Sequence, residues 1–466
     1  MPARPQSGGP LSLVEGVLCS KESEAGETKT VKFVKAEIGM VMLGVACALT
    51  FAAYADNGKP DSTLMVQSIQ VLGNESTKDF IILREMSLRV GSEVTATALE
   101  HDKNRIYNLG LFNRVDIDTV VSDRGVDLVV RVHERWYVFP YPIVGFKYRD
   151  PKNLFYGLGV THQNFRGRNE KLWFAFVLGF DRWVQMGYQS PKLTSDDDIF
   201  FRSSVSYGRV QSLSEMLQLY TQTQFSLQLS VGKRFGLYHS LVGWTNYDIW
   251  QVSVPSPGRT VSSTGRDAFV TIGLRYTIDK RNLREYTTEG YFASVYASKY
   301  GLDESEVNFF KYGYDARFFT PVIGELTFAA RTFGTISGGG VIPYYRQEFF
   351  GYDERIRGYF RKVYEGEHTL GGNVELRFPI LNPRYYIFPY SWLPEFSVWR
   401  YGLYAGLFAD VGRIWHRGEP LSLHDWKSGF GGGLHFLLPY SVVVRTEYAM
   451  NNRGIGQFVL DFGVSF

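Results

Sequence analysis

Side chains alternate in character along residues 456–466, the last segment of the chain. One set is apolar and comprises Phe458, Leu460, Phe462, Val464 and Phe466. The residues between them are polar or small, with Val459 as the exception. Because successive side chains of a β-strand point to opposite faces, this pattern predicts a strand with one wholly apolar face. A period of two excludes an amphipathic helix here, and the apolar face needs apolar surroundings.

The same alternation recurs through residues 137–466. Apolar residues take every second position in three further segments, residues 172–180, 270–278 and 374–378. Turn residues separate the strands, and we count about sixteen of them, an even number as expected for an antiparallel barrel with both ends on one side of a membrane. Bacterial outer-membrane barrels also end on an aromatic residue, so Phe462 and Phe466 are candidates for a C-terminal barrel signal. The predicted fold of this region is an all-β transmembrane barrel.

Composition agrees with a barrel and excludes a helical membrane protein for most of the chain. Aromatic residues make up 16% of the 466 residues, yet the mean hydropathy is -0.15. After residue 60 no run approaches the roughly 20 apolar residues of a membrane helix, whereas a barrel strand shows lipid only every second side chain. The all-β alternatives are a soluble sandwich and a propeller, but no propeller repeat is evident. The net charge of +3 gives no indication of a nucleic-acid partner.

A continuous apolar run near the start of the chain, residues 38–55, predicts export. Two lysines precede it, and it ends in an A-x-A pattern. This is the pattern of a secretory signal peptide, with cleavage expected between Ala55 and Asp56, so that residues 1–55 form a leader and signal peptide. The polar residues 1–30 exceed what a signal needs, and a misassigned start or a longer leader would each explain them.

Both cysteines of the sequence, Cys19 and Cys47, precede the expected cleavage point. A lipoprotein signal at Cys47 would need a large aliphatic residue three positions earlier, where Gly44 stands. The exported part therefore has no cysteine, which excludes structural disulfides and thiolate metal sites there.

Residues 64–135 combine helical and strand-like spacing of apolar residues, unlike the rest of the chain, and predict a small α+β domain. The expected elements are a strand near residues 66–71, helices at 77–86 and 96–109, and strands at 112–121 and 126–134. Apolar residues recur every three or four positions in the two helical segments and alternate in the strands. Thr95 is a candidate N-cap of the second helix. The order β-α-α-β-β over about 70 residues suits a separate domain, expected in the periplasm.

The longest outer loop of the predicted barrel contains a motif that suggests a family. Arg357, Gly358 and Tyr359, within Glu-Arg-Ile-Arg-Gly-Tyr-Phe at residues 354–360, resemble the signature of the long sixth outer loop in the BamA-type family. These proteins are the outer-membrane assembly factors also called the bacterial surface antigen family.

Three further segments carry the resemblance over nearly the whole exported chain. Residues 372–379 resemble the family's next strand, residues 408–412 its F-x-D-x-G strand, and residues 64–135 a POTRA domain. BamA itself carries several POTRA domains, whereas this chain has room for one. It is therefore either the main assembly factor of its cell or a paralogue.

The resemblance implies a loop lock made of Arg357, Gly358, Tyr359, Glu375 and Asp410. By parity, the Glu375 carboxylate points into the lumen, opposite the lipid-facing residues beside it. An arginine suits bidentate pairing with carboxylates, and Gly358 permits a close approach or a positive φ. The alternative is three solvated charges in the lumen.

Two glycines are expected to make room for the inserted loop. Gly402 and Gly406 share a face with Asp410, and a glycine in a strand often marks a close approach of another backbone. The glycine run at residues 429–433 has no Lys-Ser/Thr and no helix after it, so a crowded strand explains it better than a phosphate cradle. The histidines are scattered and no catalytic motif appears, so neither enzymatic activity nor a cofactor or metal is expected.

The first and last strands of the predicted barrel meet at a weak seam. Pro140 and Pro142 lie two residues apart, so both N–H groups that they lack belong to one side of the first strand. Gly454 and Gly456 weaken the start of the last strand. A seam that opens laterally would capture an incoming strand by β-augmentation, because unpaired backbone is costly in a membrane. Alternatively, the prolines only kink the join between domain and barrel.

These expectations combine into an outer-membrane assembly factor that folds, inserts or translocates client proteins through a lateral seam without nucleotide. The expected partners are outer-membrane lipids and client barrels or secreted proteins, with periplasmic chaperones or accessory lipoproteins as further candidates. A dedicated secretion pore of the two-partner type and a passive barrel are the alternatives. The long inner connection at residues 381–398 has no functional assignment.

Overall fold

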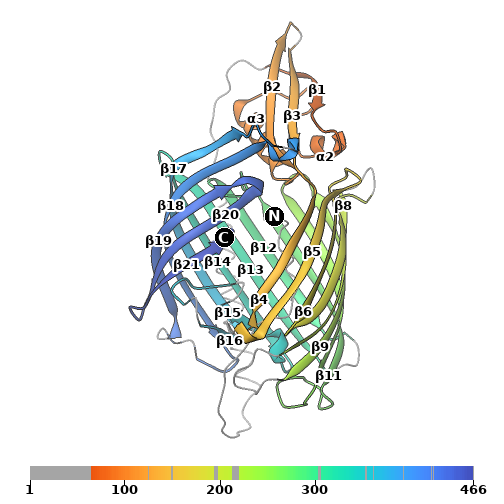
Figure 1. The fold of residues 1–466 in the computed structure, drawn as a ribbon, viewed down its shortest axis with the longest axis vertical. Coiled ribbons are helices and arrows are strands. Elements are labelled where there is room, and N and C mark those ends of the chain that lie inside the picture. The colour runs from red at the N-terminus through yellow and green to blue at the C-terminus, as the bar shows by residue number, and fades with distance from the viewer. Residues whose placement is uncertain are drawn as a thin grey trace.

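The computed structural model describes residues 64–466 except for 124, 148–150, 194–197, 212–219, 303–305, 352–353, 360–361, 392, 421, 423–424 and 465. The expected leader and signal peptide, residues 1–55, and their cleavage point lie outside the described residues. Figure 1 shows a small domain above one end of a large barrel.

The N-terminal domain has the predicted order β-α-α-β-β. Its elements are β1 (Val66–Leu72), α2 (Asp79–Leu83), α3 (Ala96–Tyr107), β2 (Phe112–Ser122) and β3 (Gly125–Glu134). Strand β3 is central, parallel to β1 and antiparallel to β2. Thr95 caps α3 as expected, since its Oγ1 accepts a hydrogen bond from the Ala98 N–H at 3.1 Å.

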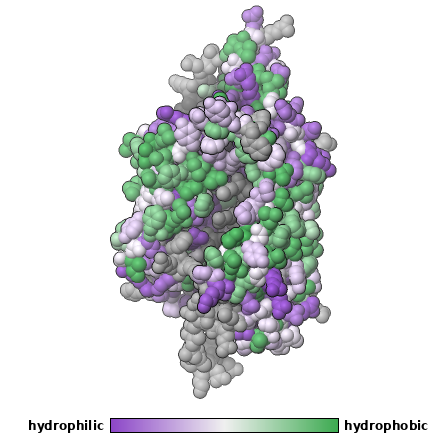
Figure 2. All heavy atoms as spheres, viewed as in Figure 1, coloured by the Kyte–Doolittle hydropathy of each residue, from purple (hydrophilic) through white to green (hydrophobic). Residues whose placement is uncertain are grey.

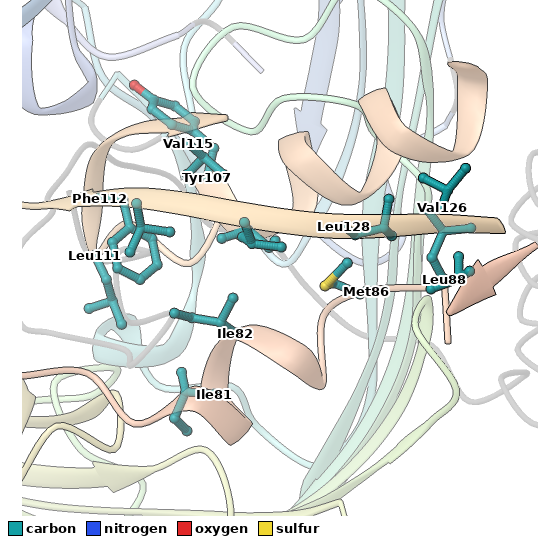
Figure 3. Close-up of a cluster of buried hydrophobic side chains, with 14 residues drawn as sticks. Ile81, Ile82, Met86, Leu88, Tyr107, Leu111, Phe112, Val115, Val126 and Leu128 are labelled. Atoms are coloured by element: carbon teal, nitrogen blue, oxygen red, sulfur yellow. The ribbon is translucent and has the colours of Figure 1, made fainter. Parts of the chain in front are cut away.

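The helices cover one face of this three-stranded sheet and form its core. Figure 3 shows Ile82 and Met86, from α2 and the segment after it, facing Leu128 of β3. The carboxylate of Asp102 on α3 is also buried, where it accepts hydrogen bonds from the backbone N–H groups of Ser87 and Leu88. These bonds satisfy the carboxylate and join α3 to the segment after α2.

The barrel is a sheet of sixteen antiparallel strands, which confirms the predicted fold class and strand number. Its strands are β4 (Val138–Phe146), β5 (Leu154–Phe165), β6 (Glu170–Gly179), β7 (Arg182–Ser190), β8 (Ile199–Gln211), β9 (Thr221–Phe235), β10 (His239–Val252), β11 (Arg266–Asp279), β12 (Gly290–Tyr300), β13 (Phe309–Ile323), β14 (Leu326–Gly339), β17 (His368–Ile387), β18 (Val398–Trp415), β19 (Lys427–Leu438), β20 (Val442–Asn451) and β21 (Gly456–Phe462).

Alternation along these strands separates an apolar outside from a polar inside. Leu376 and Phe378 are exposed on the outer surface, whereas Glu375 and Arg377 between them are buried in the lumen. Figure 2 shows the resulting apolar residues over the outer surface of the strands. Among the described residues, none of the helices is both long and apolar enough to cross a membrane.

The N-terminal domain sits on the barrel rim that carries the short turns, here named the domain-side rim. Lys78 donates its backbone N–H to Gly167 in the β5–β6 turn at 2.9 Å. Arg84 pairs with Asp198 between β7 and β8 at 2.9 Å, and Glu85 pairs with Arg234 near the end of β9. The domain is therefore held to several turns by polar contacts.

Strands β17 and β18 extend beyond the barrel wall on this side. Strand β17 covers the start of the connection at residues 381–398, up to Ile387, β18 begins at Val398, and a 3-10 turn at Pro394–Phe396 lies in the hairpin loop between them. Its tip lies against the segment that leads into β4, since the rings of Phe396 and Trp136 are 6.3 Å apart.

The end of the chain departs from the predicted alternation. The last strand stops at Phe462, Gly463 has φ +97, and Phe466 is buried with its ring 6.0 Å from Phe319 inside the barrel. The expectation that Val464 and Phe466 face lipid is therefore wrong. Hydrogen bonds from Gly463 N–H to the Val443 carbonyl (2.7 Å) and from Arg445 to the Gly463 carbonyl (2.7 Å) hold the reversal. A glycine permits this positive φ, so the tail turns into the lumen.

Candidate functional site

The long loop between β14 and β17 folds back into the barrel. Its hairpin of β15 (Glu348–Phe350) and β16 (Tyr364–Gly366) leads into a buried cluster. Phe350, Ile356 and Tyr359 pack there against Phe333 of β14. Burial of these apolar side chains favours the inserted position of the loop.

Arg357 lies at the tip of this loop and binds Asp410 of β18 through a bidentate pair. Its Nε donates to Oδ2 at 2.8 Å and its Nη2 donates to Oδ1 at 2.7 Å. The backbone N–H of Arg357 also donates to Oδ2, at 3.0 Å. The guanidinium carbon lies 3.6 Å from the centre of the Phe408 ring. Both sides of the pair are buried, so the contact is strong and geometrically specific.

Two further carboxylates share the remaining nitrogen of Arg357. Nη1 donates to Glu375 Oε2 at 3.2 Å and to Glu447 Oε1 at 3.1 Å. We name Arg357, Glu375, Asp410 and Glu447 the Arg357 cluster. The structure thus brings Arg357 to both acids named from the sequence and adds a third from β20.

Two arginines and a histidine form a second layer around the acids of the Arg357 cluster. Arg377 donates to Glu375 at 2.8 Å, and Arg445 donates to Glu447 at 3.0 Å. His435 lies between these two acids, with ring nitrogens 3.7 Å from Glu375 and 3.4 Å from Glu447. Opposite charges alternate across the lumen, so each buried acid has a cationic neighbour.

Gly358 and Tyr359 fix the loop next to Arg357. Gly358 has φ +95, a conformation that other residues rarely adopt, and Asn451 Nδ2 donates to its carbonyl at 2.9 Å. The hydroxyl of Tyr359 donates to Asn452 Oδ1. The loop tip is therefore held to the end of β20 as well as to β17 and β18.

The glycines that admit the loop differ from those expected. A Cβ at Gly429 would overlap the carbonyl oxygen of Arg357, and one at Gly412 would lie 2.7 Å from Cδ1 of Ile356. Gly406 instead faces the His435 ring, at 2.7 Å, and Gly402 faces the bulge near Pro383. The expectation for Gly402 and Gly406 was wrong because parity gives a face of the strand but not the height at which the loop lies.

A second ion cluster holds the base of the same loop. Arg331 of β14 donates to Glu354 at 2.7 Å and to Asp315 of β13 at 3.0 Å. Both carboxylates contact the Arg331 guanidinium, so this buried charge is paired. The loop is therefore anchored at two points, at Arg357 in its tip and at Glu354 before the tip.

Strands β4 and β21 form the two ends of the sixteen-stranded sheet. In the part of the chain that the structure describes, no backbone ladder joins them. The view in Figure 1 faces this break, with the yellow strand β4 on one side and the dark-blue strands β20 and β21 on the other. We name the break the seam.

The direction of the peptide groups along the seam follows from two hydrogen bonds. Gln163 N–H donates to the Tyr137 carbonyl at 2.8 Å. The backbone N–H and C=O groups of the odd-numbered β4 residues therefore point toward β5, and those of the even-numbered residues point toward the seam. Pro140 and Pro142 therefore lie with their nitrogens at the seam. After β21, Gly463 N–H donates to the Val443 carbonyl, so the backbone N–H and C=O groups of the even-numbered β21 residues also point toward the seam.

The two seam glycines have different surroundings. Gly454, with φ +74, lies in the β20–β21 turn, and nothing occupies the place of its Cβ. Gly456 begins β21, and the Tyr448 hydroxyl occupies the place where its Cβ would lie. The Tyr448 side chain thus covers the backbone of the last strand at its start.

Aromatic side chains cross the seam at the domain-side rim. The rings of Phe139 on β4 and Tyr440 in the β19–β20 turn are 5.6 Å apart and nearly perpendicular. Tyr440 also packs against Phe396, with 5.5 Å between the ring centres. Side chains rather than a backbone ladder therefore hold this end of the seam.

Two family models match the chain. The model described as the Omp85 superfamily domain matches residues 164–466. The model described as POTRA, surface antigen variable number repeat, matches residues 64–135. The chain belongs to the Omp85 superfamily. As an Omp85 protein it lies in the bacterial outer membrane, with its POTRA domain in the periplasm, so the domain-side rim is the periplasmic rim.

Relatives of this Omp85 chain are distant in sequence. It is 22% identical to the outer membrane protein assembly factor BamA of Nitratidesulfovibrio vulgaris over 309 residues, which are 63% of this chain and 37% of BamA. The chain thus spans well under half the length of that relative.

The fold is similar to that of a solved BamA structure. The crystal structure of Haemophilus ducreyi BamA lacking POTRA domains 1–3 superposes with a TM-score of 0.52 at 17% identity, covering 88% of this chain and 85% of that one. CdiB from Acinetobacter baumannii gives a TM-score of 0.49 at 13% identity, covering 86% of this chain and 73% of that one.

Sequence reasoning missed Glu447, His435 and Arg445 in this Omp85 barrel. Arg445 and Glu447 stand at alternate positions of β20 between Val444, Thr446 and Tyr448, so the parity that placed Glu375 in the lumen applies to them equally. That signal was present in the sequence. The contact of Glu447 with Arg357 was not, because it depends on which strands the inserted loop meets in the lumen.

The β11–β12 turn, residues 280–289, touches both the POTRA domain and the second layer of the site. Tyr107 of α3 donates to Glu285 at 3.0 Å, and Asn108 Nδ2 donates to the Asn282 carbonyl at 2.8 Å. The next residue, Tyr286, bonds His435 Nδ1 through its hydroxyl at 2.7 Å. No sequence pattern marks this turn as a bridge.

Proposed function

We propose that this Omp85 protein is an outer-membrane assembly factor that inserts or translocates client proteins through its lateral seam, without nucleotide and without catalysis of a chemical step. The unpaired edges of β4 and β21 carry the proposal. A lipid bilayer offers no hydrogen-bond partners for a strand edge, so an incoming strand that pairs there gains the full ladder.

The Arg357 cluster is proposed as the lock of the inserted loop, with Arg357, Gly358, Tyr359, Glu375 and Asp410 in the roles that the family resemblance suggests and Glu447 as a third acid. The burial of the three acids and their pairing with Arg357, Arg377 and Arg445 support this. A loop fixed in the lumen narrows the channel, which disfavours a passive pore. The seam is then the route for clients.

The POTRA domain is proposed to bind incoming chains at the edge of β2. This strand is at the border of its sheet, and Val120 and Val121 near its end are exposed, the latter by 66%. An edge strand can add a further strand by β-augmentation. Unfolded outer-membrane proteins, periplasmic chaperones and accessory lipoproteins are the partners that we propose. Phe462 and Phe466 are proposed as the signal by which the chain itself is assembled.

Depletion of the protein followed by quantitative profiling of the outer membrane tests this function. General loss of barrel proteins is the expected result. Loss of one secreted protein would point to a dedicated two-partner secretion pore, and an unchanged membrane would point to a passive barrel.

A cross-linked seam tests the route. The Phe139→Cys/Tyr440→Cys double variant, in a chain with Cys19 and Cys47 replaced by serine, is joined by a short cleavable thiol linker. We expect insertion of an unfolded barrel into vesicles to stop and to recover after cleavage. The matched control joins Leu172→Cys and Tyr188→Cys, which lie opposite each other on the paired strands β6 and β7. Equal insertion by both linked forms would contradict a lateral route.

A further inference from the structure

Strands β17 and β18 continue beyond the barrel wall as a two-stranded hairpin. The ladder from β17 to β14 ends at Arg377, and the ladder from β18 to β19 ends at Gly402. In the ladders that the structure describes, residues beyond these points pair only across the hairpin, as far as Ile387 opposite Val398. Figure 1 shows this part reaching toward the POTRA domain. We name its described residues between 380 and 401 the rim hairpin.

One face of the rim hairpin packs against the POTRA domain. Tyr385 and Arg400 lie opposite each other in the hairpin and therefore share this face. The Arg114 guanidinium of β2 lies 5.3 Å from the centre of the Tyr385 ring. The Arg400 guanidinium lies 5.4 Å from the centre of the Tyr107 ring on α3. This inner face is therefore occupied by the periplasmic domain.

The opposite face of the rim hairpin carries exposed aromatic side chains. Tyr386 and Trp399 lie opposite each other on this face, and both are exposed. The Phe388 ring stacks on the Trp399 ring with 5.5 Å between the centres. The ring of Tyr390 lies 6.2 Å from that of Phe388, and Tyr390 is 86% exposed. We name Tyr386, Phe388, Tyr390 and Trp399 the aromatic face.

The aromatic face continues the lipid-facing surface of the barrel. Side chains alternate along β18 from Leu407 to Trp399, so Trp399 points to the same side as the exposed Leu407. On β17 the register shifts after Pro379 add two residues. Because this number is even, Tyr386 stays on the same side as the exposed Phe378. The rim hairpin thus extends the lipid-facing side beyond the wall, toward the periplasm.

The side chains of this face suit the boundary between hydrocarbon and lipid headgroups. An exposed apolar patch marks a contact site for protein or membrane, and the continuity with the barrel surface favours membrane here. Tyr and Trp prefer this depth because their rings are apolar and carry a polar group. Arg384 lies opposite Tyr401 on the same side and is exposed. Its guanidinium suits the phosphate of a headgroup.

We propose that the aromatic face binds the phospholipid surface of the inner leaflet of the outer membrane. The rim hairpin then lies between two partners, the POTRA domain on its inner face and lipid headgroups on its aromatic face. This gives a role to a connection that is longer than a turn requires. The inference depends on the outer-membrane location of the barrel and not on the route that clients take through it.

Fluorescence quenching measures the depth of the aromatic face. A dye is attached to Tyr390→Cys on this face or to Ile387→Cys, an exposed site on the opposite face, in chains with Cys19 and Cys47 replaced by serine. The proteins are folded into vesicles of phosphatidylethanolamine and phosphatidylglycerol that contain lipids with nitroxide headgroups. We expect these lipids to quench the dye at Tyr390→Cys about three-fold more than the dye at Ile387→Cys, because only the former lies among headgroups.

A dye at Val90→Cys, an exposed site of the POTRA domain, gives the reference for a site in water. Iodide in the aqueous phase should quench this dye and the one at Ile387→Cys, and should spare the one at Tyr390→Cys. Equal quenching of the Tyr390→Cys and Ile387→Cys dyes by the nitroxide lipids would overturn the proposal. Protection of the Tyr390→Cys dye from iodide without quenching by lipid would assign the face to a protein contact and would overturn it too.

A charged variant gives a second test. Tyr390→Glu places a carboxylate at the headgroup boundary, and Ile387→Glu adds the same charge to the opposite face as the matched control. We expect Tyr390→Glu to lower quenching of a dye at Tyr386→Cys by nitroxide lipids about two-fold, because a charge at the membrane boundary opposes burial of the rings beside it. Ile387→Glu should leave this quenching unchanged. Heat-modifiable mobility confirms that each variant is folded, and an equal fall in both variants would contradict the proposal.

Discussion

At the scale of the residue, the site depends on one buried arginine shared by three acids. Arg357 binds Asp410 in a bidentate manner and reaches Glu375 and Glu447 with its third nitrogen. A buried charge costs free energy unless it is paired, so removal of the arginine exposes the repulsion among the acids.

Replacement of Arg357 by alanine should destabilise the barrel. Breaking a buried ion pair by removing one partner costs about 3–5 kcal/mol. We expect the unfolding midpoint in urea, followed by heat-modifiable mobility, to fall accordingly, with Arg357→Lys intermediate because lysine lacks the planar fork. Arg355→Ala is the matched control, since Arg355 lies in the same loop with a partly exposed side chain. Equal midpoints for the two alanine variants would contradict a lock at Arg357.

Replacement of Gly429 by alanine should displace the loop without removing a charge. The added Cβ would overlap the Arg357 carbonyl oxygen, which is backbone and cannot rotate away. We expect trypsin to cleave the loop at Arg355 or Lys362 faster in this variant, measured by the rate at which fragments appear. Gly243→Ala is the control, because no atom lies closer than 4.0 Å to its Cβ position. Cleavage at the same rate in both variants would show that the loop does not rest on Gly429.

At the scale of the element, the β11–β12 turn joins the POTRA domain to the second layer of residues around the Arg357 cluster. Glu285 and Asn282 bind the POTRA helix α3, and Tyr286 and Thr287 bind residues of the lumen. Neighbouring residues of one turn thus face opposite directions, toward the periplasmic domain and toward the site.

Replacement of Tyr286 by phenylalanine should weaken the site through His435. The buried ring nitrogen Nδ1 loses its hydroxyl partner, and a buried polar group left unpaired costs about 1–3 kcal/mol. The measurement is the free energy of unfolding from urea titration. Tyr276→Phe is the control, because Tyr276 makes a similar bond of 2.8 Å to His239 on an exposed surface. A loss of equal size in both variants would argue against a buried role for Tyr286.

At the scale of the whole molecule, polar contacts join the POTRA domain to the periplasmic rim. Glu85 pairs with Arg105 of its own domain and with Arg234 of the barrel. Burial alone would raise the pKa of the Glu85 carboxyl, but Arg234 and Arg105 outweigh it and hold that pKa below its ordinary value of 4.5.

Docking of the POTRA domain should therefore depend on pH in the acid range. A carboxyl whose pKa is lower in the docked state stabilises docking above its ordinary pKa, and this contribution is lost as the pH falls through the lowered value. We expect the distance between spin labels on domain and barrel to increase below about pH 4.5 in the parent. Glu85→Gln should weaken docking already at pH 7 and remove the step, whereas Glu100→Gln, on an exposed face of α3, should keep it. A step of unchanged size in Glu85→Gln would assign the transition to another group.

The sequence by itself determined the sixteen-stranded barrel, the β-α-α-β-β domain and the lumen-facing side of Glu375, because alternation is a local property that every strand displays along its own length. Arg357, Glu375 and Asp410 meet in the structure, while their action as a lock stays a proposal. Only the tertiary structure decided that Glu447 joins them, that Gly429 admits the loop, that Phe466 turns into the lumen and that β4 and β21 stay unpaired. Parity tells which face of a strand a residue occupies. Which faces meet across the lumen, at what height, and whether two edges close depend on residues far apart in the chain, whose distances only the folded barrel sets.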